Sequence, residues 1–161
     1  LFFSSTAPPS PADVEVQLIN GYYNYLASVP NQFVNKYADF DKNLRNLFAA
    51  LNGQKYGLPF ESQLIGDDPS LEMLKKARWR DYGIVAEVGN IEALLALFEM
   101  QDVLERELKI DMLRWQFIDD AVFFEPFSID RVMAYMLKLM IVDRWVALDH
   151  DKGKSLFVRF L

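Results

Sequence analysis

Five polar side chains stand close together in the stretch FDKNLRNLFAAL, Phe40–Leu51, among apolar residues typical of a protein core. They are Asp41, Lys42, Asn43, Arg45 and Asn46, which supply a carboxylate, an ammonium, a guanidinium and two amides. Such groups can bind polar atoms of a partner or fix a junction between helices, and they can also form the solvated side of a helix. The spacing favours the solvated side, because Asp41 and Arg45 are four residues apart and would form a surface pair worth a few tenths of a kcal/mol.

The residues around this cluster recur with helical spacing. Over residues 31–51 the apolar positions fall at steps of three and four, which predicts a helix with one apolar face. The residues on that face are Phe33, Tyr37, Phe40, Leu44, Leu47, Phe48 and Leu51. Asn46 is predicted to point well away from this face, and Asp41, Asn43 and Arg45 are predicted to flank it.

The other residue types that support catalysis are scarce. The chain has one histidine, His150, and no cysteine, so zinc sites with the usual ligands and thiol nucleophiles are excluded. Asp149 and Asp151 flank His150 and favour its charged form, which is unsuited to a resting general base. DHDKG, residues 149–153, begins like a calcium loop but lacks the third acidic ligand and the terminal Glu. No glycine-rich loop has the spacing that binds phosphates. We therefore predict no catalytic, cofactor-binding or metal-binding residue, and expect that the protein is not an enzyme.

Composition restricts the class of protein further. The chain has 161 residues, 52% of them hydrophobic, which predicts one helical domain over residues 10–161, as part of a longer protein, after a disordered or artificial tail at residues 1–9. The net charge of −6 argues against binding to nucleic acid, which needs a basic surface. The longest apolar segment, residues 132–142, includes Lys138 and is too short to span a bilayer. We therefore expect no direct membrane insertion.

The predicted fold class is all-α. Helices are expected at residues 11–28, 31–54, 69–82, 90–122 and 129–148, with a short last helix ending near residue 161. Residues 90–122 contain no proline or glycine and would form one long helix, with about six helices in an irregular bundle around it. In the first helix the residues predicted to point inward are Val14, Leu18, Tyr22, Tyr25 and Leu26. Asn31, Asp68 and Ser128 are predicted to cap the helices that follow them.

Two stretches resemble a known family. NLRNLFAALNGQKYGLP, Asn43–Pro59, resembles the helix and turn that recur in the C-subunit of bacterial and archaeal V-type ATPases, which is similar to the eukaryotic d-subunit. PFSIDRVMAYMLKLMIVDRW, Pro126–Trp145, resembles the segment of that family in which an aromatic-Ser/Thr-apolar turn opens a helix. The whole chain is closer still to an uncharacterised bacterial family encoded in V-type ATPase gene clusters, and the resemblance covers most of Val14–Leu161. Asp143-Arg144-Trp145 stands where the C-subunit has Asn-Leu-Arg, and the chain is much shorter than a complete protein of that family.

The resemblance implies a non-catalytic connector, because in the ATPase the C-subunit sits on the membrane rotor ring and receives the tip of the central shaft. It implies shaft and rotor-ring subunits as partners, and a cytoplasmic protein that is peripheral to the membrane through the ATPase complex. It also implies that Asp41, Asn43, Arg45 and Asn46 contact a partner or fix a helix junction. Two alternatives stay open: a general helical scaffold or adaptor for an unrelated protein, and a carboxylate-dependent hydrolase, which requires acids that converge in a cleft.

Overall fold

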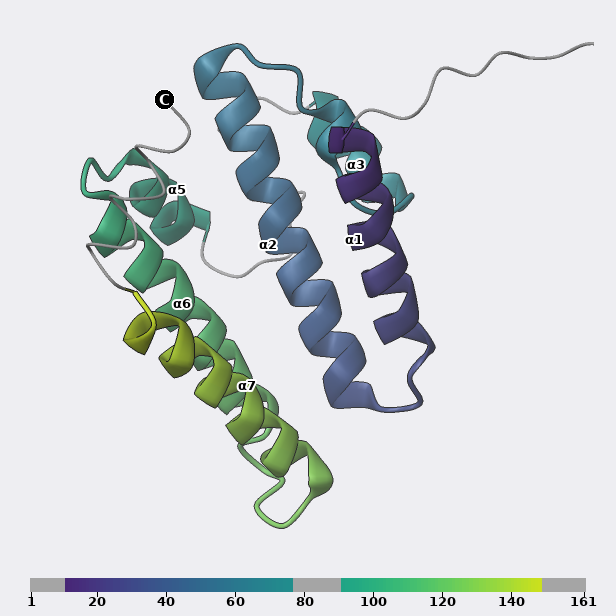
Figure 1. Ribbon diagram of the computed structural model, residues 1–161, viewed down its shortest axis with the longest axis vertical. Helices are drawn as coiled ribbons and strands as arrows, with labels where there is room; N and C mark the ends of the chain where they lie inside the picture. Colours follow the sequence, from purple (N-terminus) through teal and green to yellow (C-terminus); the bar gives the residue numbers. More distant parts are fainter. Residues whose placement is uncertain (1–10, 77–90, 149–161) are drawn as a thin grey trace, which may run out of the picture. The chain divides into compact units, whose positions relative to one another are not determined.

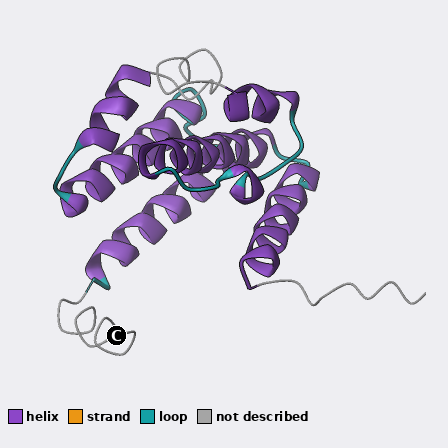
Figure 2. Cartoon of the chain, turned by 90° about the horizontal axis from the view of Figure 1, so that it is seen from above, coloured by secondary structure: helices purple, strands orange, loops and turns teal. Residues whose placement is uncertain are grey.

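The computed structural model describes residues 11–76 and 91–148, and these are helices joined by turns and loops (Figure 1). The helices are α1 (Pro11–Ser28), α2 (Gln32–Tyr56), the short 3₁₀ helix η1 (Glu61–Gln63), α3 (Pro69–Lys76), α5 (Ile91–Glu99), α6 (Val103–Ala121) and α7 (Ile129–Val146). Within the described ranges there is no strand, as Figure 2 shows. The all-α prediction is confirmed.

Local capping signals set several of the helix ends. Asn31 lies in the extended region before α2, and its side chain accepts a hydrogen bond from the N–H of Val34 at 2.8 Å. Ser128 caps α7 in the same way through the N–H of Arg131. Gly57 ends α2 with φ 64°, a left-handed conformation that glycine adopts without steric cost. The predicted caps at Asn31 and Ser128 are therefore confirmed, and α1 has the predicted bounds.

The prediction of one long helix over residues 90–122 is wrong. Helix α5 ends at Glu99, the N–H of Met100 donates to the carbonyl of Leu97 at 3.2 Å, and α6 begins at Val103. The chain divides into two compact units at this point, Leu1–Asp102 and Val103–Leu161. The bundle is therefore not built around one long helix.

The predicted tail at residues 1–9, the helical residues 77–82 and the last short helix with His150 lie outside the described residues. One domain over residues 10–161 stays a prediction, because a compact unit within a chain is not by itself a domain that folds independently.

In the first unit, α1 and α2 run side by side, joined by the turn around Pro30 (Figure 1). The centre of α2 is fully buried at Leu44, Leu47 and Ala50. Gly53 makes a close approach possible, because a Cβ at this position would lie 2.3 Å from a ring carbon of Phe60. The chain after α2 therefore folds back directly onto the helix surface.

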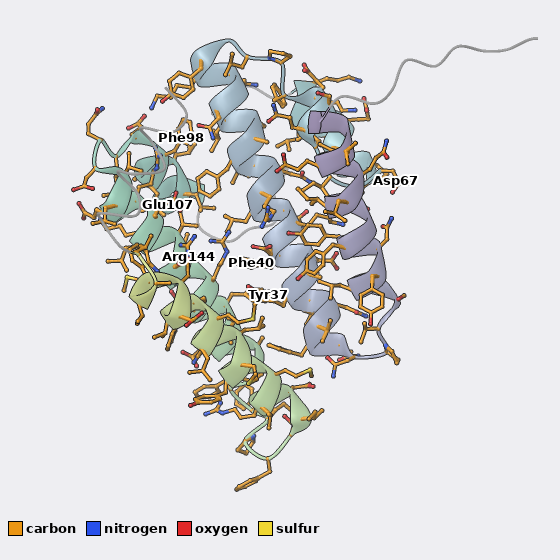
Figure 3. The ribbon with its side chains drawn as sticks, in the orientation of Figure 1. Tyr37, Phe40, Asp67, Phe98, Glu107 and Arg144 are labelled. Carbon is orange, nitrogen blue, oxygen red and sulfur yellow. The ribbon has the colours of Figure 1, made fainter. Side chains whose placement is uncertain are left out.

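In the second unit, α6 and α7 form a helical hairpin. The carboxylate of Asp111 on α6 is buried and binds three donors: Arg114 at 3.0 Å, Arg144 of α7, and the indole Nε1–H of Trp145 at 2.8 Å. Arg144 also lies 3.9 Å from the carboxylate of Glu107, and both residues are labelled in Figure 3. One aspartate thus ties the C-terminal end of α7 to the middle of α6.

Candidate functional site

Asp41 lies in the junction between α1 and α2, where only 9% of its surface is exposed. The hydroxyl of Tyr23 on α1 donates to its Oδ2 at 2.6 Å, and Nε of Arg45 donates to the same oxygen at 3.3 Å. The predicted pair of Asp41 and Arg45 is therefore present, but Asp41 is buried and the pair is not a simple surface contact. Its carboxylate joins two helices.

The environment of Tyr23 favours its protonated form. Burial of the ring raises the pKa of Tyr23 well above its ordinary value of 10.0, and the hydrogen bond to Asp41 and the charge of that carboxylate raise it further. The phenol therefore stays a donor over the whole physiological pH range. The neutral hydroxyl of Tyr23 and the guanidinium of Arg45 together offset the free-energy cost of burying the carboxylate of Asp41.

Asn46, which was predicted to point away from the apolar face of α2, is not solvated there but buried, with 2% of its surface exposed. Its amide makes a reciprocal pair of hydrogen bonds with the backbone of Ile65: the N–H of Ile65 donates to Oδ1 at 2.8 Å, and Nδ2 donates to the carbonyl of Ile65 at 2.9 Å. The segment after α2 packs on the side of the helix that a single apolar face leaves to solvent. Asn46 fixes this segment to α2.

The other two predicted residues face the surface to different degrees. The side chain of Arg45 is half exposed, and Asn43 is half-buried. Of the four predicted site residues, Asp41 and Asn46 make internal contacts, whereas Arg45 and Asn43 remain accessible to a partner. The structure therefore does not bring all four side chains to one surface.

Contacts between distant segments complete this junction, and the sequence did not predict them. The N–H of Gly66 donates to Oδ1 of Asn20 on α1 at 2.7 Å. Nζ of Lys42 lies 2.9 Å from Asp68 and 3.4 Å from Asp39. Burial disfavours the charge of Lys42, but the two carboxylates outweigh it and raise the pKa of this lysine. The contacts of Gly66 and Asp68 join segments 46 and 26 residues apart, so no local spacing could have indicated them.

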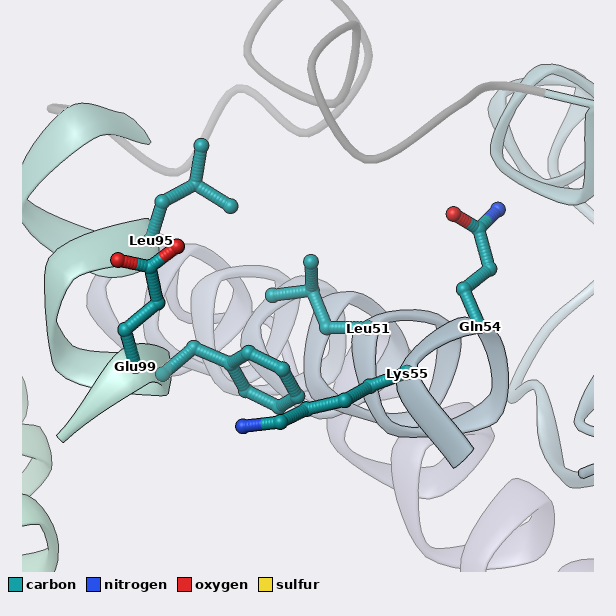
Figure 4. A pocket seen from close by; sticks show the side chains of 6 residues that line it. Leu51, Gln54, Lys55, Leu95 and Glu99 are labelled. Carbon is teal, nitrogen blue, oxygen red and sulfur yellow. The ribbon is translucent and has the colours of Figure 1, made fainter. Parts of the chain in front are cut away.

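A cavity of about 370 Å³ lies between the last turns of α2 and α5 (Figure 4). Its lining residues are Leu51, Gln54, Lys55, Leu95, Phe98 and Glu99. Nζ of Lys55 lies 4.7 Å from the centroid of the Phe98 ring, a cation–π contact between the two helices. The walls are mainly apolar, and the ammonium already rests on an aromatic face. The cavity therefore resembles a gap between two packed helices more than a reaction site.

A stripe of large apolar side chains on α1 faces away from α2. Val14, Leu18, Tyr22 and Tyr25 are 50% to 74% exposed, whereas Tyr23 is buried. These four residues, which we call the α1 stripe, were predicted to point inward, and that prediction is wrong. Instead, Tyr23 packs into the core together with Ile19 and Leu26, which are partly buried. Both sides of α1 are apolar, and α2 covers only one of them.

The acids do not form a reactive group in the part of the chain that the structure describes. No three His, Cys, Asp or Glu residues there are placed to hold a metal ion. Among the described residues two carboxylates are buried, Asp41 and Asp111; they belong to different units, and donors bind each of them. Among the described helices, none is long and apolar enough to cross a membrane. The features that stand out are thus a rigid helix junction and an uncovered apolar stripe beside it.

Comparison with known proteins gives one match. A family model described as "Protein of unknown function (DUF2764)" matches residues 7–161. The searches of curated proteins and of solved structures found no match.

Proposed function

The chain belongs to the DUF2764 family, and we propose that it is a non-catalytic helical connector that binds other proteins through the α1 stripe, as an accessory or coupling subunit of a bacterial V-type ATPase. The observation that carries this proposal is the exposure of Val14, Leu18, Tyr22 and Tyr25 on one side of one helix. Contiguous exposed apolar surface on a folded protein marks a site of interaction with another macromolecule.

The geometry of the α1 stripe suits recognition by a helix or groove. Its residues are spaced at i, i+4, i+8 and i+11, so their side chains project within about 80° of one another. Tyrosine is enriched at protein interfaces because its ring buries a large area at low entropic cost while its hydroxyl can still bind a polar partner. Tyr22 and Tyr25 therefore have the properties of anchor residues.

The junction beneath the stripe would hold it rigid. Tyr23 follows Tyr22 directly and binds Asp41 of α2, and Asn20 binds the backbone of Gly66. Two hydrogen bonds, one through Asn20 and one through Tyr23, thus fix α1 on its inner side. A preorganised surface loses little conformational entropy on binding, which favours affinity.

The choice of a V-type ATPase as partner comes from the sequence resemblance of Asn43–Pro59 and Pro126–Trp145 to the C-subunit of that enzyme. On this proposal the partners are the shaft and rotor-ring subunits, and the protein is cytoplasmic and peripheral to the membrane through the complex. The accessible residues of the predicted cluster, Asn43 and Arg45, would add polar contacts. The coupling role needs a stable helical body with exposed contact surfaces.

Affinity purification of the tagged full-length protein from its native cells tests the proposal. Mass spectrometry after mild detergent should show enrichment of V-type ATPase shaft and ring subunits. The Leu18→Glu variant should lose this enrichment, because a charge in the centre of the stripe would have to be desolvated on binding. Glu61→Gln, a change of one exposed residue outside the stripe, serves as a control and should leave recovery unchanged.

The second candidate function is a helical scaffold or adaptor for an unrelated protein. The same α1 stripe favours it, since an apolar stripe does not by itself identify its partner. Enrichment of other proteins with no ATPase subunit, again lost in Leu18→Glu, would support the adaptor and contradict the ATPase role.

A further inference from the structure

Helix α7 carries large apolar side chains on the side that α6 does not cover. The side toward α6 carries Ala134, which is buried, and Lys138 and Trp145, which bind Asp119 and Asp111 of α6. The opposite side carries eight large apolar side chains that are 42% to 79% exposed. These residues, which we call the α7 outer face, are Ile129, Val132, Tyr135, Met136, Leu139, Met140, Val142 and Val146.

The outer face has the spacing of a helix-pairing surface. Val132, Leu139 and Val146 follow one another at intervals of seven, and the positions between them continue the steps of three and four. This pattern is the heptad repeat by which one helix packs along another. A single contact with α6 does not require it, because α6 lies on the other side of the helix.

The centre of the outer face is also symmetric about Leu139. When two α7 helices run antiparallel around a two-fold axis at this residue, positions equally far before and after Leu139 lie level with each other. Met136 then lies level with Val142, and Val132 with Val146. In both pairs an apolar residue meets another apolar residue.

The one charged residue within the outer face obeys the same symmetry. Viewed along the helix axis, the side chain of Asp143 points between those of Met136 and Leu139. In the antiparallel arrangement Asp143 lies level with Tyr135 of the partner subunit. The exposed hydroxyl of Tyr135 is a donor that can bind this carboxylate across the axis. The contact would occur twice and would satisfy the charge placed in the apolar surface.

We propose that the α7 outer face is a homodimer interface in which the α7 helices of two copies pack antiparallel about Leu139. At about 120 Å² of apolar surface for a whole aliphatic side chain, the eight exposed groups offer on the order of 500 Å² on each partner. Two such faces together give about 1,000 Å², the low end of the range for specific interfaces. The interface uses α7 alone and is independent of the function proposed for the α1 stripe.

Sedimentation velocity of the full chain at micromolar concentration measures the oligomeric state directly. The wild type should have twice the mass of one chain. Leu139→Glu should be monomeric, because two carboxylates would meet at the two-fold axis. Leu18→Glu, a matched change on α1, should stay dimeric. A monomeric wild type, or a Leu139→Glu variant that remains dimeric, would overturn the proposal. Circular dichroism should show equal helix content in both variants, since both positions are exposed.

Two further experiments test the register. The chain has no cysteine, so Leu139→Cys gives a single thiol that should cross-link to its symmetry mate in high yield, whereas Leu18→Cys should not. Tyr135→Glu should weaken the dimer at least tenfold through repulsion of Asp143 of the partner subunit, and adding Asp143→Lys should restore it. Absence of both the cross-link and the rescue would rule out the antiparallel arrangement even if the protein is dimeric.

Discussion

Replacing Asn46 by Ala should destabilise the protein strongly although the change removes only a small polar side chain. The amide makes two hydrogen bonds to the backbone of Ile65, at 2.8 and 2.9 Å, and is almost completely buried. Truncation leaves one N–H and one carbonyl without these partners, and each unsatisfied buried group costs about 1 to 3 kcal/mol. Water reaching Ile65 would lower this cost, so we expect a loss of about 2 to 4 kcal/mol in the free energy of unfolding.

The assay is urea denaturation followed by far-UV circular dichroism, with Asn43→Ala as the matched control. Asn43 is the same residue type on the same helix and is half-buried. Its replacement should change the free energy of unfolding by less than about 0.5 kcal/mol. Equal stabilities of the two variants would refute the assignment of Asn46 to an internal junction and return it to the candidates for partner contact.

Three other changes test the remaining contacts. Tyr23→Phe should cost about 1.5 to 3 kcal/mol, because it removes a hydrogen bond to a buried carboxylate. Since folding raises the pKa of Tyr23, its contribution is complete below pH 10.0 and falls as the pH rises toward the folded value, so Tyr23→Phe should also flatten the alkaline loss of stability. Gly53→Ala should cost about 1 to 3 kcal/mol, because its Cβ would overlap Phe60. Asp111→Ala should cost about 2 to 4 kcal/mol, because its donors on α6 and α7 lose their acceptor. Thermal and urea unfolding measure all three.

Each change has a control in the same unit of the chain. Tyr22→Phe removes an exposed hydroxyl next to Tyr23 and should change the free energy of unfolding by less than about 0.5 kcal/mol. Gly21→Ala meets no atom within 4 Å and should stabilise α1 by about 0.5 to 1 kcal/mol. Asp120→Ala lies on the exposed side of α6 and should be close to neutral. If a control variant lowers the stability as much as the variant it is paired with, the corresponding contact is contradicted.

The helix ends were predictable because their signals are local. Asn31 and Ser128 lie next to the N–H groups that they bind, and Pro11 and Pro69 occupy first helical positions. The break after Glu99 has no proline or glycine to mark it, but Asp102 and Glu105 at the start of α6 have the spacing of a capping box, a signal that the prediction of one long helix did not use.

The orientation of side chains was predicted less well than the helices themselves. In α1 two apolar sets alternate, one with Leu18 and Tyr22 and the other with Ile19 and Tyr23, and periodicity alone does not decide which set α2 covers. Asn46 was assigned to solvent because the helix was considered alone, without the segment around Ile65. Such placements depend on partners distant in sequence, which the spacing of neighbouring residues does not encode.

Binding of the purified full-length chain to a purified complex of V-type ATPase shaft and ring subunits tests the central claim most directly. Biolayer interferometry should show saturable binding by the wild type, and Leu18→Glu should weaken it at least about tenfold, the effect of losing one interface anchor of more than 1 kcal/mol. No binding by the wild type would contradict the ATPase role. Equal binding by Leu18→Glu would contradict the use of the α1 stripe.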